Sequence, residues 1–143
     1  MGTQDTLLVM HGGGPTAVIN ASLFGAVDEA LRTPEAGRVL GALGGVGGIL
    51  DGRVDFGTVS RETLALLPHS PSSAIGTSRK PLEEKDYRAL AHALKREHVR
   101  WLLPTGGNGT MNTCGEIWRA CRAEGMNIDV VGIPKTMDND IAV

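Results

Sequence analysis

Short apolar runs alternate with amphipathic stretches along the chain, and glycine residues mark the junctions between them. The runs that fit β-strands are Thr6 to Met10, Arg38 to Leu43 and Val99 to Leu103. The near-continuous apolar run from Ile128 to Ile133 is typical of a central parallel strand that is covered on both faces. A weaker strand candidate spans Ser72 to Ile75.

Three longer segments predict helices, because their apolar residues recur at intervals of three and four. The first begins at Pro15, which suits a first helical position, and the second begins at about Leu82 with acidic residues in its first turn. The third follows Gly109 and is expected to end at Gly125. Its single apolar stripe consists of Met111, Cys114, Ile117, Trp118 and Cys121.

The connections between these elements contain two further segments of note. The glycine-rich stretch from Gly44 to Gly52 is expected to be a loop, and Ser60 to Leu67 a short helix that Pro68 ends. The overall alternation of strands and helices predicts an α/β fold, with a doubly wound, mostly parallel sheet and helices on both faces. A length of 143 residues suits one domain and is too short for two full α/β lobes.

Charge and composition narrow the range of partners. The chain has 14 basic and 16 acidic residues, a net charge of −2, which predicts neither a nucleic-acid nor a membrane partner. No apolar run approaches the ~20 residues of a membrane span, and we expect a cytoplasmic protein. Cys114 and Cys121 are expected to be reduced thiols in the core, without the spacing of a metal site.

Glycine is enriched, with 20 residues, and two clusters stand between a predicted strand and a predicted helix. Gly12 to Gly14 and Gly106 to Gly109 can each present backbone N–H groups to an anion at a helix N-terminus. Glycine also occurs in such turns for tightness alone, and both explanations remain open for each turn. Neither turn matches the dinucleotide fingerprint GxGxxG, and the chain has no P-loop, which disfavours nicotinamide enzymes and Walker-type ATPases.

Two polar segments complete the candidate chemistry. Gly76 to Lys80 combines two cations with two hydroxyls in a turn that suits phosphate oxygens, although a solvated basic loop would look the same. Pro134 to Asp140 follows a buried strand, where open α/β sheets bind ligands. In an extended backbone Asp138 and Asp140 would point to the same side, so one could act as a base while the other holds a metal or orients the first.

Read in order, four blocks resemble the successive motifs of the phosphofructokinases and cover nearly the whole chain. They are Gly13-Gly14-Pro15 through Asn20, Gly76 to Arg79, Gly106 to Thr110, and Pro134 to Ile141. The resemblance implies the N-terminal, donor-binding lobe of a kinase that phosphorylates the 1-hydroxyl of fructose 6-phosphate in glycolysis. It also implies a chain that is truncated before the second sugar-phosphate lobe, and a homo-oligomer, dimer or tetramer, for the whole protein.

The resemblance assigns roles residue by residue. Asp138 is expected to be the catalytic base, with Lys135, Thr136 and Asp140 beside it and with Thr136, Asp138 and Asp140 contacting the sugar. The residues expected at the donor phosphates are Gly13, Gly14, Arg79, Lys80, Gly107, Gly109 and Thr110. The implied cofactor is Mg²⁺, but the family's usual aspartate is replaced here by Asn108, a weaker metal ligand.

Two residues bear on the identity of the phosphoryl donor, and they favour different donors. Gly109 leaves space for the nucleotide of ATP, whereas the ammonium of Lys135 can neutralise the charge of a pyrophosphate donor. Val46 aligns loosely where ATP-using members often have an aromatic residue. On balance the sequence favours ATP over pyrophosphate. The alternatives are an NAD- or lipid-kinase-like enzyme, which shares the turn at Gly106 to Thr110, and a noncatalytic sugar-phosphate-binding module, which Asn108 favours.

Overall fold

A computed structural model of the chain describes residues 4–138 and 140–142. Within these residues six strands form one sheet in the order β3-β2-β1-β4-β5, and β6 also pairs with β4. The strands are β1 (Thr6–His11), β2 (Arg38–Ala42), β3 (Arg53–Asp55), β4 (Val99–Gly106), β5 (Asp129–Val130) and β6 (Ile133–Pro134). Every pairing is parallel except that of β2 with β3. The prediction of a mostly parallel α/β fold is therefore confirmed.

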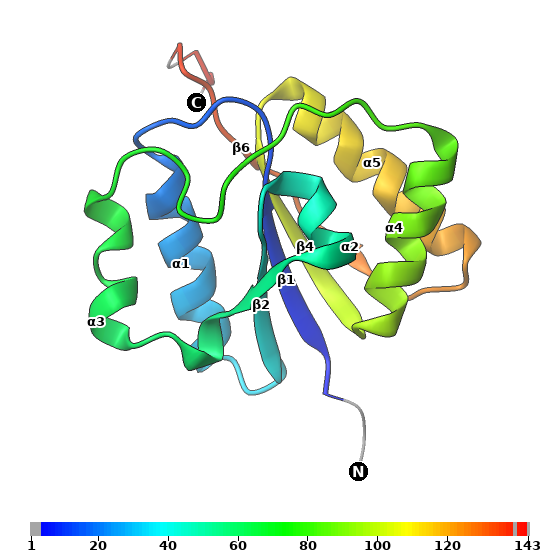
Figure 1. Cartoon of the computed structure of the whole chain (residues 1–143), viewed down its shortest axis with the longest axis horizontal. Coiled ribbons are helices and arrows are strands. Elements are labelled where there is room, and N and C mark those ends of the chain that lie inside the picture. The colour runs from blue at the N-terminus through cyan, green and yellow to red at the C-terminus, as the bar shows by residue number, and fades with distance from the viewer. Residues whose placement is uncertain (1–3, 139, 143) are drawn as a thin grey trace.

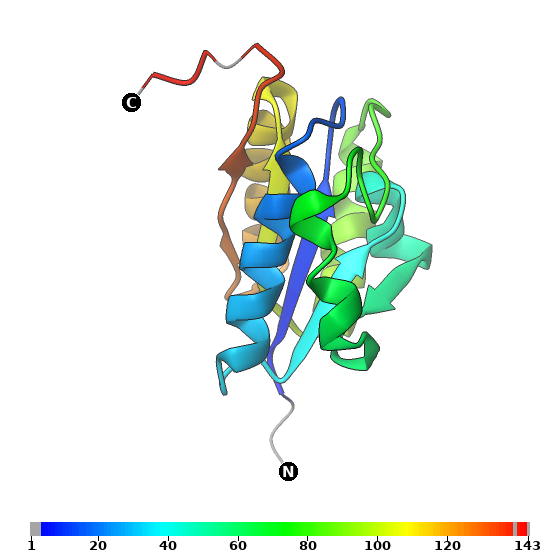
Figure 2. The same cartoon turned by 90° about the vertical axis from the view of Figure 1, so that its left-hand side faces the viewer.

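Helices cover both faces of the sheet. In the described part of the chain they are α1 (Ile19–Arg32), α2 (Gly48–Asp51), α3 (Arg61–Leu64), α4 (Glu84–Arg96) and α5 (Asn108–Ala123), with 3₁₀ turns η1 (Gly45–Gly47), η2 (Phe56–Thr58) and η3 (Leu67–His69). Figure 1 shows α1 and α3 on one side of the sheet and α2, α4 and α5 on the other. Figure 2, turned by 90°, shows α1 and α3 lying in front of the strands.

The alternation of side chains along β1 divides the core into two layers. Leu8 and Met10 point to the layer under α4 and α5, and Val9 points to the layer under α1. Both layers exclude water: Leu94 of α4 and Leu23 of α1 are 0% exposed. The continuous apolar run from Leu7 to Met10 within β1 is thus explained by burial on both faces.

The first helix begins at Ile19 rather than at the predicted Pro15. The preceding turn uses its backbone donors elsewhere: Gly12 N–H donates to the Thr105 carbonyl at 2.9 Å, and Gly13 N–H to the Ser78 carbonyl at 3.1 Å. These bonds tie the turn to β4 and to the loop before α4, and they delay the helix by about one turn.

The connection between β2 and α4 differs most from the prediction. The expected loop from Gly44 to Gly52 contains η1 and α2, and the strand β3 follows it. The stretch from Ser72 to Ile75 forms no strand, and Ser72 has a positive φ of 66°. The helix expected from Ser60 to Leu67 is shorter: the Ser60 hydroxyl accepts from Thr63 N–H at 3.2 Å as its N-cap, and Pro68 lies inside η3.

The end of the chain also departs from expectation in two places. Trp118 is 45% exposed, whereas Ile117 beside it is 0% exposed, so the tryptophan lies at the margin of the apolar stripe and not in it. The run from Ile128 to Ile133 forms β5 and β6 at the edge of this sheet, with Val131 between them 54% exposed. The prediction of a central strand was therefore wrong for the sheet that these residues form.

Other local predictions are confirmed. The helix α4 has the predicted acidic residues in its first turn, and two of them form a capping box in which Glu83 N–H donates to the Asp86 carboxylate at 2.8 Å. Gly125 follows the last turn of α5 with φ of +72°. Cys114 and Cys121 are buried free thiols, and burial raises the pKa of both, to about 11 for Cys121. Among the described residues, no helix has the length and apolar character to cross a membrane.

Candidate active site

The candidate site lies where the carboxyl ends of three strands meet. His11 at the end of β1 is in register with Thr105 of β4, and Thr105 is in register with Ile133 of β6. The two glycine turns and the segment that follows β6 therefore emerge side by side. Lys135 N–H donates to the Gly106 carbonyl at 3.0 Å, which joins the last segment to the turn after β4.

A first cavity of about 400 Å³ lies between the first glycine turn, the loop before α4 and the start of α5. Six of the seven residues predicted to bind donor phosphates line it. They are Gly13, Arg79, Lys80, Gly107, Gly109 and Thr110. Two cations and several backbone groups without β-carbons thus surround a space that can hold an anion.

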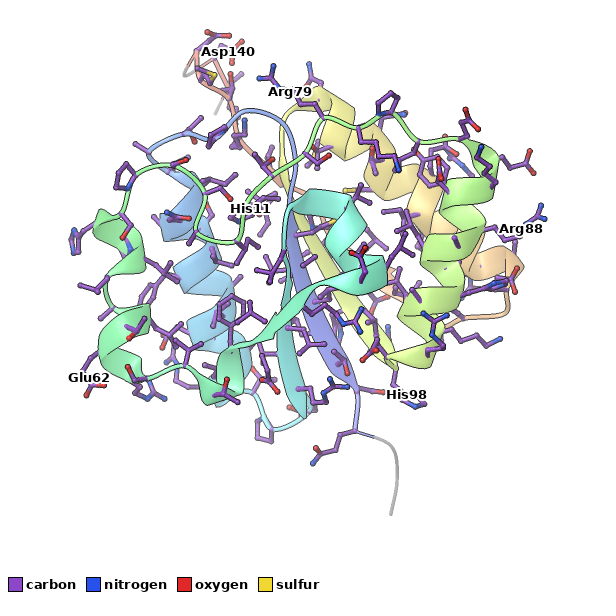
Figure 3. The ribbon with its side chains drawn as sticks, viewed as in Figure 1. His11, Glu62, Arg79, Arg88, His98 and Asp140 are labelled. Carbon is purple, nitrogen blue, oxygen red and sulfur yellow. The ribbon has the colours of Figure 1, made fainter. Side chains whose placement is uncertain are left out.

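A second cavity of about 680 Å³ adjoins the first on the side of β6. The remaining predicted residues line it: Gly14, Asn108, Lys135, Thr136, Asp138 and Asp140. Arg79 and Gly107 line both cavities, so they form the boundary between them. Figure 3 shows Arg79 and Asp140 at the same end of the molecule, with His11 beneath them. The structure therefore brings together the residues predicted for catalysis, for the donor phosphates and for the metal.

The absence of side chains at Gly13 and Gly14 serves this geometry directly. Gly13 has φ of +73°, a conformation that favours glycine. A β-carbon on Gly14 would lie 2.8 Å from Nη2 of Arg79. Glycine at position 14 therefore lets the guanidinium lie against the turn, where it reaches both cavities.

Gly12 and Gly106 have a different role, because both face Thr110 in the first turn of α5. A β-carbon on Gly12 would lie 2.3 Å from Oγ1 of Thr110, and one on Gly106 would lie 2.2 Å from the same atom. Thr110 is 8% exposed and fills the space that these glycines leave. Its hydroxyl is turned toward the two turns, so its contribution to the first cavity is mainly steric.

The loop that carries Arg79 and Lys80 is tied to the first glycine turn. The Thr77 hydroxyl donates to the Gly13 carbonyl at 2.7 Å, and the Ser78 hydroxyl accepts from Lys80 N–H at 3.0 Å. The two hydroxyls predicted to face a phosphate are thus used in holding the loop. The two cations, both exposed, remain as the groups that face an anion.

Lys135 lines the second cavity and reaches the first glycine turn from it. Its side chain is only 7% exposed, and its ammonium donates to the Gly14 carbonyl. The position of a β-carbon on Gly13 would be 3.8 Å from this ammonium. A positive charge is therefore held at the base of the first glycine turn, where a phosphate chain would end.

Asp138 lies in a bend and not in the extended backbone that we expected, and Asn139 between the two carboxylates lies outside the described residues. The chain bends at Met137 and Asp138, and Asp138 N–H donates to the Thr136 hydroxyl at 3.1 Å. Asp138 and Asp140 are both exposed and both face the second cavity. No cluster of three or more metal-binding His, Cys, Asp or Glu side chains occurs in the described part of the chain.

His11, the last residue of β1 before the first glycine turn, was not identified by the sequence analysis. It is 0% exposed, and its Nδ1 lies 2.7 Å from the Ser73 hydroxyl. Burial, and secondarily the charge of Lys135, lower the pKa of His11 to about 4. Its position directly before the first glycine turn was the signal that could have identified it.

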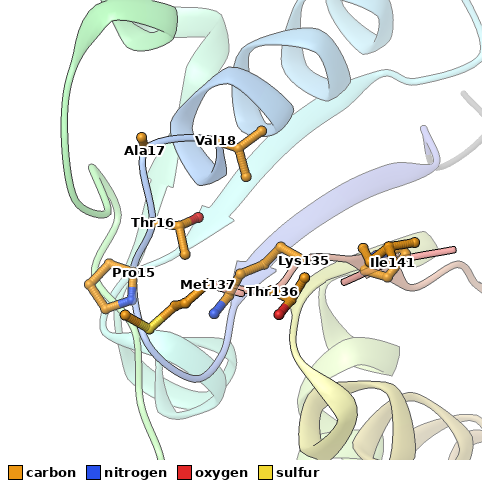
Figure 4. A pocket seen from close by; sticks show the side chains of 9 residues that line it. Pro15, Thr16, Ala17, Val18, Lys135, Thr136, Met137 and Ile141 are labelled. Atoms are coloured by element: carbon orange, nitrogen blue, oxygen red, sulfur yellow. The ribbon is translucent and has the colours of Figure 1, made fainter. Parts of the chain in front are cut away.

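A third cavity, of about 560 Å³, opens between the start of α1 and the segment after β6. Figure 4 shows Thr16 and Val18 on one side of it and Lys135, Thr136 and Met137 on the other. Its lining is largely apolar, and Met137 is 71% exposed there. Val46, which aligned with a donor-contacting position, lines none of these three cavities and lies 7% exposed in the core.

Comparison with known proteins places this geometry in a family. The family described as phosphofructokinase matches residues 6–143. A pyrophosphate–fructose 6-phosphate 1-phosphotransferase of Xanthomonas campestris pv. campestris is 36% identical over 99% of the chain, and an ATP-dependent 6-phosphofructokinase of Trypanosoma brucei brucei is 26% identical over 98%. The chain spans only 35% and 28% of the length of these two relatives.

The fold comparison agrees. A crystal structure of a pyrophosphate-dependent phosphofructokinase from Nitrosospira multiformis superimposes with a TM-score of 0.89 at 28% sequence identity. The match covers 98% of this chain and 35% of that structure. The sheet, the two glycine turns and the segment after β6 are therefore all included in the shared fold.

Proposed function

The chain belongs to the phosphofructokinase family, and from that membership we propose that it is the donor-binding lobe of an enzyme that transfers a phosphoryl group to the 1-hydroxyl of fructose 6-phosphate. One observation carries the proposal: two cavities adjoin, and Arg79 and Gly107 form the boundary between them. A phosphoryl group moves between a donor and an acceptor, so its two partners must occupy neighbouring spaces with a cation between them.

Asp138 is proposed as the catalytic base. Its carboxylate is exposed toward the second cavity, where an acceptor hydroxyl would bind next to the boundary at Arg79. Lys135 lines the second cavity and donates to the Gly14 carbonyl of the first glycine turn, and Thr136 fixes the backbone of Asp138 through a 3.1 Å hydrogen bond. A carboxylate that takes the proton of the acceptor while cations neutralise the donor is the general requirement of this reaction.

The test is the Asp138→Asn variant of the complete protein, which keeps the shape but cannot accept a proton. We expect kcat to fall by at least ~10²-fold while fructose 6-phosphate still binds. The matched control is Asp51→Asn, an exposed carboxylate at the end of α2 and outside the three cavities, which should behave as wild type. Unchanged kcat in Asp138→Asn would remove this residue from the mechanism. Fructose 6-phosphate binding by a wild-type protein that shows no turnover would favour the noncatalytic module.

We propose pyrophosphate as the donor, which revises the preference of the sequence analysis for ATP. The relative at 36% identity and the structure at 28% are both named as pyrophosphate-dependent, and Lys135 holds a charge at the base of the glycine turn. Gly109 still leaves room for a nucleotide, because a β-carbon there would meet nothing within 4 Å. ATP thus remains the alternative donor.

The Gly109→Asp variant separates the two donors. Its side chain enters open space at the start of α5, where an acidic residue suits the helix dipole, so the fold should tolerate it. Any use of ATP should fall through repulsion of the α-phosphate, while turnover with pyrophosphate should persist. Gly109→Ala, which adds volume without charge, is the control. Wild-type kcat/KM that favours ATP over pyrophosphate would refute the donor proposal.

The second cavity fits the implied Mg²⁺ with few ligands from the protein. Asp138, Asp140 and the amide oxygen of Asn108 are hard oxygen donors that line one space. Mg²⁺ keeps several waters and shares phosphate oxygens with its substrate, so one or two carboxylates suffice to hold it. When bound, the ion neutralises negative charge on the phosphates, and Asn108 would hold it more weakly than an aspartate.

A lobe of this kind is incomplete for catalysis by itself. The residues described here supply one wall of the second cavity, and a sugar phosphate needs further cations that we assign to the remainder of a longer protein. We therefore expect the isolated chain to show no phosphorylation of fructose 6-phosphate. Turnover by the purified, monomeric chain would contradict this division. Oligomeric assembly and a cytoplasmic location stay predictions.

A further inference from the structure

His11 is an unusual residue for a fully buried position. It is 0% exposed, burial and the nearby charge of Lys135 lower its pKa to about 4, and it is therefore uncharged at neutral pH. Its Nδ1 pairs with the Ser73 hydroxyl, but its Nε2 has no partner among the described residues. An unpartnered buried nitrogen destabilises the fold, so an apolar side chain of similar size would be the better choice for packing alone.

Ser73 belongs to the connection that leads to Arg79, and a second buried polar side chain holds that connection. Asn20 of α1, 1% exposed, accepts from Ala74 N–H at 2.8 Å and donates to the Ser70 carbonyl at 3.0 Å. The segment from Ser70 to Ala74 is thus fixed by hydrogen bonds to side chains of β1 and α1. This explains why it stays irregular and yet lies against the core.

Beyond this fixed segment, the connection continues to the first glycine turn. Gly44 N–H donates to the Ile75 carbonyl at 2.7 Å, and Gly13 N–H donates to the Ser78 carbonyl at 3.1 Å. Arg79 is the next residue, and its guanidinium lies where a β-carbon on Gly14 would be 2.8 Å away. A shift of the segment from Ser70 to Ala74 would therefore be transmitted through a few residues to the guanidinium at the boundary of the two cavities.

We propose that His11 is a positioning residue, which acts through Ser73 to hold Arg79 at the boundary between the donor and acceptor cavities. The inference rests on the proposed function for the reaction that Arg79 serves. The contacts that lead from His11 to Arg79 concern binding of the donor. The neutral imidazole suits this task, because it makes a directional hydrogen bond without adding a second charge beside Lys135. The side chain itself contacts no substrate in this role.

Two substitutions at His11 separate the hydrogen bond from the volume. His11→Asn places a polar atom close to the position of Nδ1 and preserves the bond to Ser73, whereas His11→Leu fills the space and removes the bond. Ser73→Ala removes the same bond at a half-buried site, where the fold should tolerate the change. We expect His11→Leu and Ser73→Ala each to weaken pyrophosphate binding by ~10-fold or more, since small displacements at a phosphate site are costly.

The decisive measurement is a set of double variants of the complete protein, read by calorimetric titration with pyrophosphate and by kcat and KM. His11→Leu combined with Ser73→Ala should be no weaker than either variant alone, and His11→Leu should have little effect in an Arg79→Ala background. His11→Asn should bind nearly as well as wild type. Additive losses, or equal damage from His11→Asn and His11→Leu, would overturn the inference.

The binding readout keeps this test apart from that of the proposed function. If the wild-type protein binds pyrophosphate but does not phosphorylate fructose 6-phosphate, the proposed function fails, and the coupling of His11, Ser73 and Arg79 is still measured by titration. If turnover is normal and the losses are additive, only the role of His11 fails. Equal thermal midpoints of His11→Asn and His11→Leu would show that a difference in binding does not come from partial unfolding.

Discussion

The distances around the glycines of the two turns predict how alanine substitutions there change the free energy of unfolding. In Gly12→Ala the new methyl group would lie 2.3 Å from Oγ1 of Thr110, more than 1 Å closer than the 3.4–4 Å of an ordinary contact. Thr110 is buried in the first turn of α5, so relief of the contact needs a change of its rotamer or a shift of the helix. Overpacking of this kind costs ~1–3 kcal/mol of unfolding free energy. In Gly109→Ala nothing lies within 4 Å, and replacing a helical glycine adds up to ~1 kcal/mol of stability.

Urea unfolding of the complete protein measures both changes, and the unfolding free energies of the two alanine variants should differ by ~1–4 kcal/mol, with changes of opposite sign from wild type. A third variant identifies the contact responsible. Thr110→Ala removes both atoms that come closest, which leaves the Thr110 β-carbon at 3.3 Å from the new methyl group. Gly12→Ala should therefore cost much less in a Thr110→Ala background than alone. An unchanged cost in the two backgrounds would refute the assignment of Gly12 to packing against α5.

Two further predictions concern pH and the helix α5. The pKa of about 4 for folded His11, against 6.5 in the unfolded chain, means that its contribution is fully present above pH 6.5 and is lost as the pH falls toward 4. Between pH 7 and pH 4, the unfolding free energy of wild type in urea should fall by about 3 kcal/mol more than that of His11→Asn. Parallel curves of unfolding free energy against pH for the two proteins would exclude this. On α5, Ile117→Ala should lower the unfolding free energy by ~2–5 kcal/mol because Ile117 is 0% exposed. Trp118→Gln should lower it far less, because Trp118 is 45% exposed. Equal losses at the two positions would place Trp118 in the core after all.

The sequence was informative where one strand or helix decides its own structure. The helices α4 and α5 follow from their apolar spacing and caps, and β1 and β4 follow from apolar runs that end in glycine turns. The approach of the predicted site residues also follows, because parallel strands put their carboxyl ends at one edge of a sheet. Each of these inferences needs only local pattern and the rule that connects it to topology.

Prediction failed where a contact distant in sequence decides the structure. The start of α1 was misplaced because Gly12 and Gly13 donate to Thr105 and Ser78, which are more than 60 residues away. The stretch from Ser72 to Ile75 has strand-like composition, but Asn20 and His11 supply its hydrogen bonds in place of a neighbouring strand. The position of His11 before a glycine turn was a local signal, but its hydrogen-bond partner could not be predicted because Ser73 lies 62 positions further on.

The two glycine turns show why the question of packing or phosphate binding could not be decided turn by turn. In each turn the first glycine of the pair, Gly12 or Gly106, faces Oγ1 of the same threonine within 2.3 Å of a β-carbon position. The second glycine, Gly13 or Gly107, has no neighbour closer than 3.8 Å and lines a cavity. Packing therefore accounts for the first glycine of each turn, and the proposed phosphate site uses the second. The first glycine brings α5 against the turn, and this close approach sets the position of the second glycine at the edge of the first cavity.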